Sequence, residues 1–317
     1  MIDISVIIVN WNTNELLLDC VDSLYRTTRN SSLEIIVVDN ASTDGSVDIL
    51  HKKFPQVQTI VNSCNFGFAK ANNIGIRKAK GRYICLVNSD VKALDGVLDK
   101  MHGYMESQPE IGALAPRAYF GDMQIQKTCR KFPTLRNIFC EEFFLNTMFP
   151  TVAAFRGREM HWFDYETTME IEVLSGYFLM VRSEVVRQVG LLDQRFFFYS
   201  EDVDWCKRIH DAGWKLVYYP KAEAIHYGGG SSANDAARFN VELIKANWQY
   251  WKKHKSTAEV ALFWLIKFTG ALLREVGWNI VGLVKPAMKP QAKVSADGYR
   301  KIRTWLMIPR FKNENAP

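Results

Sequence analysis

Tyr83-Ile84-Cys85-Leu86-Val87-Asn88-Ser89-Asp90 is a short apolar run that ends directly in a polar triplet. Such a run is typical of a strand buried on both faces of a parallel sheet. In open α/β sheets, ligands bind beyond the carboxyl ends of these strands. The triplet is therefore either a polar turn or part of a binding site, and its carboxylate and amide suit a hard cation such as Mg²⁺ or Mn²⁺.

The same strand signal recurs upstream and alternates with helical periodicity. Strands are predicted at 4–9, 34–38, 57–61 and 83–87, and helices at 16–24, 46–54 and 68–79. This alternation predicts βαβ units with right-handed crossovers, and hence an α/β fold with a Rossmann-like, mostly parallel central sheet flanked by helices. Asn12 and Glu15 have the spacing of a capping box at the start of the first helix.

Polar clusters follow three of these four strands, at 10–12, 39–40 and 88–90. The carboxyl ends of parallel strands share one rim of the sheet, so the clusters should meet there. Asp39 is either a neighbour of a helix cap or an acceptor for a donor group on a nucleotide base or ribose. The first strand is not followed by GxGxxG, and the chain has no P-loop pattern, so neither an NAD site nor P-loop chemistry is expected.

The segment Asn65-Phe66-Gly67-Phe68-Ala69-Lys70 leads into the third predicted helix. Gly67 permits close approach of the backbone to a ligand. The asparagines at 65, 72 and 73 either cap the helix or form a polar wall beside a nucleotide.

Aromatic and acidic residues adjoin in the second half of the chain. Four aromatics at 196–199 precede Glu201, Asp202 and Asp204. Burial and like-charge repulsion raise the pKa of a carboxyl group in general, which makes it a better base. The alternative is a helix N-terminus, where acids favour the macrodipole. Upstream, a strand is predicted at 173–182, and the Ser-Gly step inside it is typical of close approach by a ligand or backbone.

His226 precedes a triple glycine that permits its loop to close over a ligand. It is either a structural histidine or a nitrogen ligand to a cation held by Asp90. A strand is predicted at 215–219, and residues 224–226 are a short apolar entry to the glycine-rich loop. Residues 130–134 form a basic and aromatic turn, and 139–149 form either a helix or a flap over an acceptor.

The composition is ordinary for a globular protein of 317 residues, with 48% hydrophobic and 23% charged residues and a formal charge of +6. This charge permits an anionic substrate or membrane surface and is too small to indicate nucleic acid binding. The six cysteines form no CxxC pair, so we expect reduced cysteines in a cytoplasmic protein. The N-terminus has no signal-peptide pattern, and we expect no clean transmembrane helix.

Residues beyond 235 are basic and aromatic, and then largely apolar over 257–284. At about 100° per residue, Lys267, Arg274 and Lys285 fall on one line of a helix. This pattern indicates either a helix in a membrane interface or packing against the catalytic domain or a second subunit. We expect residues 288–317 to be partly irregular.

Together these motifs resemble those of family 2 glycosyltransferases with a GT-A fold, in the rhamnosyltransferase-like branch that builds bacterial surface polysaccharides. The resemblance covers roughly residues 3–235. It rests on Val9-Asn10-Trp11-Asn12, Val38-Asp39-Asn40-Ala41-Ser42, Asn65-Phe66-Gly67-Phe68-Ala69, Asn88-Ser89-Asp90, Ser175-Gly176, Tyr199-Ser200-Glu201-Asp202-Val203-Asp204 and His226-Tyr227-Gly228.

The resemblance implies roles for several residues. Asn88-Ser89-Asp90 matches the DxD motif, with Asp90 as the metal-binding acid and Asn88 in place of the first aspartate. Asp39 matches the residue that contacts a pyrimidine base, Asp202 the catalytic base beside Glu201, and His226 a metal ligand. We expect the nucleotide to contact Val9, Asn10, Asn12, Asp39, Asn65, Gly67, Lys70, Asn88 and Ser89, and the acceptor to contact Ser175, Gly176 and Trp205.

The resemblance therefore implies an inverting, Mg²⁺- or Mn²⁺-dependent transfer of one sugar, such as rhamnose, from a dTDP- or UDP-sugar to a glycan or lipid-linked acceptor. The Gln-x-x-Arg-Trp motif of processive synthases is absent. The alternatives are a non-catalytic nucleotide-sugar-binding protein and a nucleotidyltransferase. We expect a nucleotide-sugar-binding half at 1–110, an acceptor-binding and catalytic half at 111–235, and a helical extension at 236–317 that contacts the inner face of the membrane or a second copy.

Overall fold

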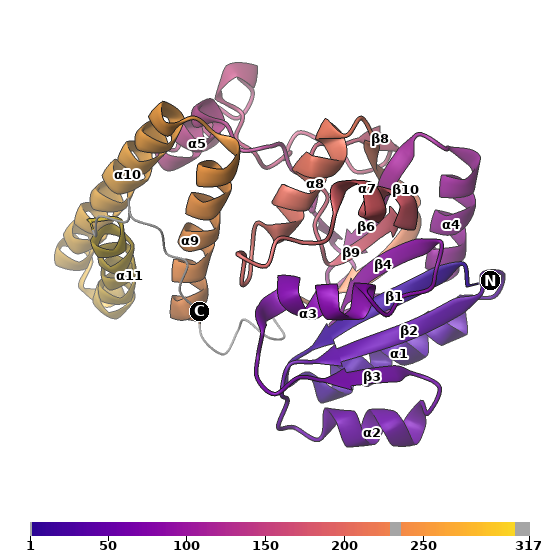
Figure 1. Ribbon diagram of the computed structural model, residues 1–317. Coiled ribbons are helices and arrows are strands. Elements are labelled where there is room, and N and C mark those ends of the chain that lie inside the picture. The colour runs from indigo at the N-terminus through magenta and orange to yellow at the C-terminus, as the bar shows by residue number, and fades with distance from the viewer. Residues whose placement is uncertain (1, 229–235, 308–317) are drawn as a thin grey trace. The chain divides into compact units, whose positions relative to one another are not determined.

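The computed structural model describes residues 2–228 and 236–307, and the chain divides into two compact units (Figure 1). The first unit comprises Met1–Phe132 and Glu159–Asn234, and the second comprises Pro133–Arg158 and Asp235–Pro317. The expected three-part division had grouped residues 133–158 with the catalytic half. In the structure these residues belong to the same unit as the C-terminal helices.

A ten-stranded sheet forms the centre of the first unit, in the order β3-β2-β1-β4-β9-β6-β10-β5, with β7 on β6 and β8 on β10. The strands are β1 (Ile4–Asn10), β2 (Leu33–Asp39), β3 (Gln58–Val61), β4 (Tyr83–Asn88), β5 (Val91–Ala93), β6 (Ile111–Tyr119), β7 (Ile125–Gln126), β8 (Met169–Glu170), β9 (Phe178–Arg182) and β10 (Lys215–His226). The helices of this unit are α1 (Asn14–Thr27), α2 (Ser46–Lys53), α3 (Gly67–Ile76), α4 (Val97–Ser107), α7 (Ser183–Val189) and α8 (Glu201–Asp211).

The strand β1 lies in the parallel part of the sheet, between β2 and β4. Ile4, Val6 and Ile8 on one face of β1 pack in a single core with apolar residues of α1 and α4. Ile7 on the other face meets α3 at Gly75, where a Cβ atom would lie 2.5 Å from the Ile7 side chain. Helices thus cover both faces of these strands, as their continuous apolar runs predict.

The strand β9 joins the two parts of the sheet, because it pairs antiparallel with both β4 and β6. It begins at Phe178, so the Ser175-Gly176 step predicted inside a strand precedes it, and Gly176 lies in a turn. The strand predicted at 215–219 and the apolar segment at 224–226 are parts of one strand, β10. Its register against β6 shifts between Tyr219 and Glu223, a bulge that accommodates Pro220.

The loop after β1 differs from its predicted form. The N-cap of α1 is Thr13, which makes no side-chain cap hydrogen bond, so the predicted capping box of Asn12 and Glu15 is wrong. Asn12 Oδ1 instead accepts a hydrogen bond of 2.8 Å from the backbone N–H of Thr43. Asn12 thereby ties the loop after β1 to the loop after β2.

The second unit is helical in its described part. Its helices are α5 (Leu135–Glu142), α6 (Leu145–Met148), the 3₁₀ turn η1 (Ala153–Phe155), α9 (Ala236–His254), α10 (Thr257–Val284), the 3₁₀ turn η3 (Pro286–Met288) and α11 (Lys289–Met307). Residues 139–149 therefore lie mostly in helices, which agrees with the first of the two predictions for this segment, a helix or a flap over an acceptor. The segment expected to be partly irregular is helical through Met307, and residues 308–317 lie outside the described part.

The helix α10 binds its neighbours through charged residues on two sides. Lys267 and Arg274 both form ion pairs with Glu142 of α5. These two residues, which were predicted to lie on one line of a helix, therefore contact another helix of the same unit. On another side, Glu275 pairs with Arg300 at 3.0 Å and with Arg303 at 2.7 Å, both on α11. Within residues 2–228 and 236–307, no helix combines the length and apolar character needed to cross a bilayer.

Candidate active site

Three polar side chains end neighbouring strands at one rim of the sheet. In the ladders of β1, Asn10 is the partner of Asp39 on β2, and Val9 is the partner of Asn88 on β4. The predicted meeting of the polar clusters at this rim is thereby confirmed.

Hydrogen bonds connect the rim residues to one another. Asn10 and Asp39 are fully buried, and the Asn10 amide donates to Asp39 Oδ1 at 2.7 Å. Asp39 Oδ2 accepts from the backbone N–H of Ser42 at 2.9 Å. The Thr13 hydroxyl lies 2.7 Å from both Asn10 Oδ1 and Ser89 Oγ, which links β1 to the end of β4. Contact between Asp39 and a nucleotide base stays a prediction.

The asparagines around the start of α3 mainly hold the protein's own backbone. Asn65 Oδ1 accepts from the Gly67 N–H at 2.9 Å. Asn73 is buried and exchanges two hydrogen bonds with the backbone of Leu192. The Lys70 ammonium lies 3.7 Å from the centre of the Phe66 ring. Asn73 is therefore structural, and Asn65 and Lys70 are the members of this segment that remain candidates for a nucleotide.

Gly67 brings α3 against the loop that precedes α8. Its φ is +78°, and a Cβ atom here would lie 2.4 Å from the carbonyl oxygen of Phe197. The N–H of Phe68 donates to that same oxygen at 2.8 Å. The close approach predicted at Gly67 is therefore made by the protein's own backbone, and it fixes the loop leading to Glu201 and Asp202.

Gly67→Ala should lower the free energy of unfolding by roughly 2–4 kcal/mol, because a left-handed non-glycine residue and an overpacked contact add their penalties. Gly45→Ala is the matched control: Gly45 has a φ of +75°, and no described atom lies within 4 Å of the position that a Cβ atom would take there. It should cost about 1–2 kcal/mol. Urea unfolding measures both losses, and equal losses would contradict the role of Phe197.

Asp90 and His226 form a second polar pair beyond β4. His226 Nε2 lies 3.4 Å from Asp90 Oδ1, and both side chains are largely buried. His226 Nδ1 lies 2.8 Å from Gln126 Oε1, and its ring stacks on Tyr177 with centroids 4.9 Å apart. Because an amide oxygen only accepts, Nδ1 carries a proton and donates it to Gln126.

This arrangement places Nε2 of His226 beside the Asp90 carboxylate. With the proton on Nδ1, Nε2 carries a lone pair, and the side-chain amide nitrogen of Asn88 lies 3.4 Å from it. A cation bound here would contact both Nε2 and the Asp90 carboxylate oxygen 3.4 Å away. An imidazole whose other nitrogen is held by a hydrogen bond is typical of metal-binding histidines.

The pair fits Mn²⁺ or Mg²⁺ as a partial ligand set. Carboxylate oxygen suits both ions, and imidazole nitrogen suits the transition metal better. No group of three or more His, Cys, Asp and Glu side chains across residues 2–228 and 236–307 is arranged to hold a metal. The remaining coordination positions would be filled by water and substrate phosphates, as is usual for Mg²⁺.

Glu201 and Asp202 lie at the start of α8 in different surroundings. Asp202 Oδ2 accepts from the N–H of Gly176 at 3.2 Å, and Oδ1 accepts from the N–H of Val203 at 2.8 Å. The Glu201 side chain is buried, and its Oε2 has no hydrogen-bond partner among the described residues. Burial, and then repulsion from Asp202, raise the pKa of Glu201 well above its ordinary value. Asp204 is fully buried and pairs with Arg208 at 2.9 Å, so it serves the helix.

Glu201→Gln should stabilise the fold at neutral pH and stabilise it further at higher pH. Because folding raises the pKa of Glu201, the unfolded chain releases this proton at a lower pH, and the wild-type protein loses stability as pH rises between the two pKa values. The difference in Tm should be small below about pH 4. Above that pH the difference in Tm should grow, by roughly 2–4 °C for each kcal/mol by which the variant is more stable. Thermal melts across the pH range test this, and a pH-independent difference would contradict it.

Two consecutive residues connect Asp202 with the Asp90–His226 pair. The N–H of Gly176 donates to Asp202. The Tyr177 carbonyl accepts from the N–H of Asn88 at 2.8 Å, and the Tyr177 ring stacks on His226. Since neighbouring Cα atoms are about 3.8 Å apart, the two polar groups flank the same dipeptide.

Gln126 is a site residue that the sequence did not single out, and Arg130 belongs to the predicted basic and aromatic turn at 130–134. Arg130 lies 3.3 Å from Glu159. Burial lowers the pKa of Arg130, but the carboxylates of Glu159 and Asp202 raise it above its ordinary value overall. Gln126 lies 100 positions before His226, in a two-residue strand, and no local signal marks it.

The predicted acceptor-binding residues separate into two groups. Trp205 is fully buried, and its indole N–H donates to the Gly190 carbonyl at 2.9 Å. It offers no surface to an acceptor, which contradicts its predicted role. Ser175 is half-buried beside Gly176, which binds Asp202, so these two remain candidates.

Backbone strain gathers in the loops of this region. Four non-glycine residues with positive φ are Asn12 at 54°, Ala41 at 60°, Tyr199 at 73° and Ser200 at 64°. Each left-handed residue costs about 1–2 kcal/mol, and such strain clusters at functional sites. The loops after β1 and β2 and before α8 are thus held in defined conformations.

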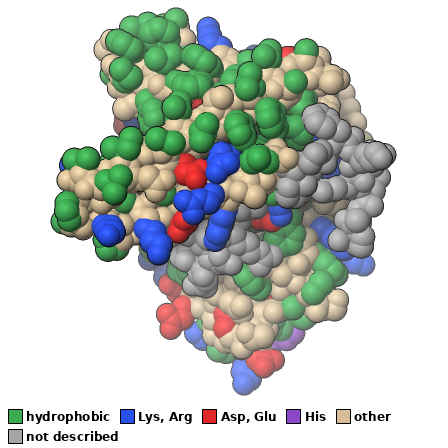
Figure 2. Space-filling model, turned by 90° about the vertical axis from the view of Figure 1, so that its left-hand side faces the viewer, with side chains coloured by type: hydrophobic (Ala, Val, Ile, Leu, Met, Phe, Trp, Pro, Cys, Tyr) green, Lys and Arg blue, Asp and Glu red, His purple; other side chains and the backbone are tan. Residues whose placement is uncertain are grey.

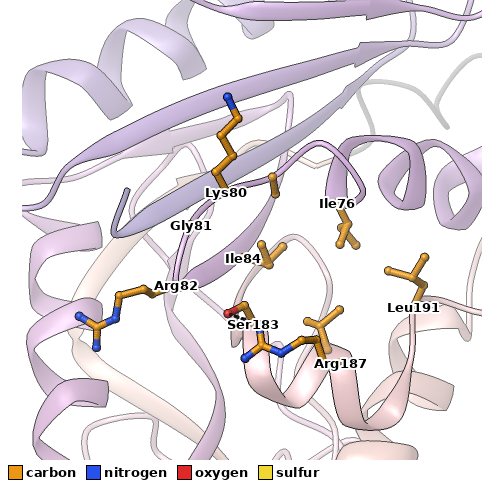
Figure 3. Close-up of a pocket in the computed structure, with 10 residues that line it drawn as sticks. Ile76, Lys80, Gly81, Arg82, Ile84, Ser183, Arg187 and Leu191 are labelled. Carbon is orange, nitrogen blue, oxygen red and sulfur yellow. Dashed lines mark hydrogen bonds between the residues drawn. The ribbon is translucent and has the colours of Figure 1, made fainter. Parts of the chain in front are cut away.

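A cavity of about 590 Å³ lies elsewhere, at the opposite end of β4 (Figure 3). It is lined by the start of β4 and by α7, and two of its cations have partners in the protein. Arg82 pairs with Glu106 at 2.7 Å, and Arg187 donates to the Ser183 hydroxyl at 3.3 Å. Because Asp90 follows the carboxyl end of β4, this cavity is separate from the candidate site.

The sequence matches the family model described as glycosyl transferase family 2 over residues 5–181, which is more than half of the chain. This chain belongs to glycosyl transferase family 2. A second model, described as glycosyl transferase family group 2, matches residues 125–288. The predicted family and the predicted enzyme class, a glycosyltransferase, are confirmed. The two alternatives, a non-catalytic binding protein and a nucleotidyltransferase, have no support.

Two relatives of this family 2 glycosyltransferase are rhamnosyltransferases. The N-acetylglucosaminyl-diphospho-decaprenol L-rhamnosyltransferase of Mycobacterium tuberculosis is 26% identical over 256 residues, which cover 76% of this chain and 81% of that protein. Rhamnosyltransferase WbbL of Escherichia coli is 30% identical over 198 residues, which cover 58% of this chain and 70% of that protein. The predicted likeness to the rhamnosyltransferase branch is confirmed.

A solved structure supports the fold of this family 2 glycosyltransferase. A mannosyltransferase from Pyrobaculum calidifontis, in complex with GDP-Man and Mn²⁺, matches with a TM-score of 0.54 and 15% identity, covering 95% of this chain and 87% of that chain. The predicted GT-A fold, with its central sheet, flanking helices and C-terminal helical extension, is confirmed.

Proposed function

We propose that this glycosyltransferase moves one sugar residue from a nucleotide-diphosphate sugar to an acceptor hydroxyl, with inversion at the anomeric carbon. The main support is the dipeptide Gly176-Tyr177, which contacts Asp202 on one side and His226 and Asn88 on the other. The reaction needs a proton acceptor near the attacking hydroxyl and positive charge near the departing diphosphate. Asp202 would meet the first need, and a cation held by Asp90 and His226 would meet the second.

Asp202 is the proposed base. Its carboxylate takes a proton from the acceptor hydroxyl as that oxygen attacks the anomeric carbon from the face opposite the nucleotide. The transition state has oxocarbenium character, as in glycoside hydrolysis. The N–H groups of Gly176 and Val203 orient the carboxylate, and Glu201 supports the start of α8 from the buried side.

Asp90 and His226 are the proposed holders of Mg²⁺ or Mn²⁺. A divalent cation bound there supplies Lewis-acid charge that stabilises the nucleotide diphosphate as a leaving group. Gln126 holds the proton on His226 Nδ1 and leaves Nε2 as the ligand atom. The Mn²⁺ and GDP-Man in the mannosyltransferase complex support this chemistry.

The rim residues are the proposed nucleotide site. Its members are Val9, Asn10, Asn12, Asp39, Asn65, Lys70, Asn88 and Ser89, and the predicted member Gly67 is left out because Phe197 occupies the space beside it. The names of the two rhamnosyltransferase relatives support rhamnose as the sugar. The proposed nucleotide carrier is dTDP or UDP.

The proposed acceptor is a glycan or lipid-linked glycan of a bacterial surface polysaccharide, next to Ser175 and Gly176. The decaprenol-linked substrate in the name of the Mycobacterium tuberculosis relative supports a lipid carrier. The protein would then act in the cytoplasm, in peripheral contact with the inner face of the cell membrane. Self-association is compatible with this proposal.

A thermal-shift panel of UDP-, dTDP- and GDP-sugars with and without Mn²⁺ tests the proposal. One donor class should raise Tm, and Mn²⁺ should increase the shift. The donor that binds is then used in a transfer assay that resolves the anomeric configuration of the product. Failure of every donor to shift Tm, or retention of configuration, would contradict the proposal.

A further inference from the structure

The helix α10 exposes an apolar face along most of its length. The exposed residues are Leu262, Leu265, Leu272, Leu273, Val276, Ile280, Leu283 and Val284. At about 100° per residue they lie in one sector of the helix. Lys267 and Arg274, which bind Glu142, lie on the opposite side. Figure 2 shows many hydrophobic side chains gathered on this face of the molecule, with Lys and Arg side chains beside them.

The turn between α10 and α11 combines apolar and basic side chains. We define the α10–α11 corner as residues 283–294. Leu283, Val284 and Val294 are 80%, 71% and 74% exposed, which makes them the three most exposed large hydrophobic residues among those described. Lys285, Lys289 and Lys293 are exposed within the same twelve residues. Apolar tips interleaved with lysines are typical of segments that lie in a membrane interface.

The charge of this region identifies the kind of surface that it fits. Residues 236–307 contain 13 Lys and Arg residues and 4 Asp and Glu residues, a net charge of +9. The whole chain has +6, so the rest of the chain is net negative. A second copy that docked through the same helices would bring the same positive charge to the contact, whereas anionic lipid headgroups attract this charge.

We propose that the apolar face of α10 and the α10–α11 corner dock on the surface of an anionic lipid bilayer. Leu283, Val284 and their neighbours along α10 enter the boundary between headgroups and acyl chains, and the corner lysines contact lipid phosphates. The docking requires no transmembrane helix, and it gives the peripheral membrane contact a defined surface. It requires no sugar transfer by the protein.

Flotation of the full chain with vesicles tests the docking. The protein should bind vesicles of phosphatidylcholine mixed with phosphatidylglycerol and bind pure phosphatidylcholine vesicles at least tenfold more weakly. The variant K285Q/K289Q/K293Q should lose at least tenfold in affinity for the mixed vesicles, at about fivefold per lysine. The variant L283S/V284S should also lose at least tenfold, because two exposed apolar side chains no longer insert.

Matched controls carry the same chemical changes in the first unit. Val61 is 59% exposed, and Val61→Ser should bind vesicles as the wild type does. The exposed lysines 52, 53 and 100 provide the charge control K52Q/K53Q/K100Q. Asp202→Asn should also float normally, which separates a failure of docking from a failure of the proposed sugar transfer.

Four results would overturn the docking proposal. They are no binding to the mixed vesicles, equal binding to both kinds of vesicle, wild-type binding by either corner variant, and an equal loss in the control variants. Analytical ultracentrifugation tests whether a second copy of the chain binds this surface instead of a membrane. If L283S/V284S converts a dimer to a monomer and neither protein binds vesicles, the surface belongs to a second copy of the chain.

Discussion

Replacing Asp202 by asparagine should leave the binding of the donor nucleotide intact and lower kcat by about 10²- to 10⁴-fold, the usual contribution of a general base. Asparagine has nearly the same size, and its one amide oxygen keeps one of the two hydrogen bonds that the carboxylate accepts from the N–H groups of Gly176 and Val203. Loss of the other hydrogen bond should cost about 1 kcal/mol and leave the start of α8 folded. The variant also loses the group that takes a proton from the acceptor hydroxyl. Donor affinity by calorimetry and steady-state kinetics measure the two effects separately.

Asp211→Asn is the control for this experiment. Asp211 ends the same helix, is exposed and pairs with Lys207, so the same change at that end should leave kcat within about twofold. Turnover by Asp202→Asn within tenfold of the wild-type rate would show that Asp202 is not the base. Loss of donor binding or of several degrees in Tm would show a structural effect and would likewise contradict the assignment.

The strands that carry the site could be predicted because their signals are local. The observed bounds of β1, β2 and β4 differ from the predicted strands by at most one residue at each end. A strand that is covered on both faces is apolar throughout, so it can be recognised in the sequence without knowing which elements pack against it. Once the strands are parallel, the meeting of Asn10, Asp39 and Asn88 at one rim follows from the topology.

The contacts that assemble the rest of the site join distant parts of the chain, and no local pattern contains them. Gly67 has the composition of a ligand-binding turn, yet Phe197 occupies the space beside it. Gln126 orients His226 across 100 residues. Trp205 follows three carboxylates, and only the packing of α8 shows that it is buried.

The C-terminal helices show the same limit. The spacing of Lys267 and Arg274 places them on one side of a helix, but spacing does not say what that side faces. Glu142, more than a hundred positions earlier, is their partner. The exposed apolar sector of α10 is therefore distinct from the side that Lys267 and Arg274 occupy. Lys285, the third cation of the predicted line, is the C-cap residue of α10 with a non-helical φ of −121°, so it belongs with the corner lysines.

Asp90→Asn should weaken Mn²⁺ binding and lower kcat/KM by roughly 10²-fold or more, since the charge that a divalent ligand set supplies to such a reaction is worth several kcal/mol. The asparagine side chain would keep the volume of the aspartate but lose the negative charge beside His226 Nε2. Donor affinity without Mn²⁺ should change little, and the increase caused by Mn²⁺ should disappear. Calorimetric titrations of Mn²⁺ and of donor measure these effects.

Asp95→Asn is the matched control. Asp95 is close to Asp90 in sequence, its side chain is 81% exposed, and its ion pair with Arg29 is long, at 3.8 Å, so loss of its charge should leave Mn²⁺ binding and kcat/KM unchanged. His226→Gln supplies the sharper test. If Asp90 and His226 hold one cation, either change alone removes most of the effect of Mn²⁺, and the double variant should be little worse than Asp90→Asn. Additive losses would mean that the two side chains act independently, and a full Mn²⁺ response in Asp90→Asn would remove Asp90 from the metal site.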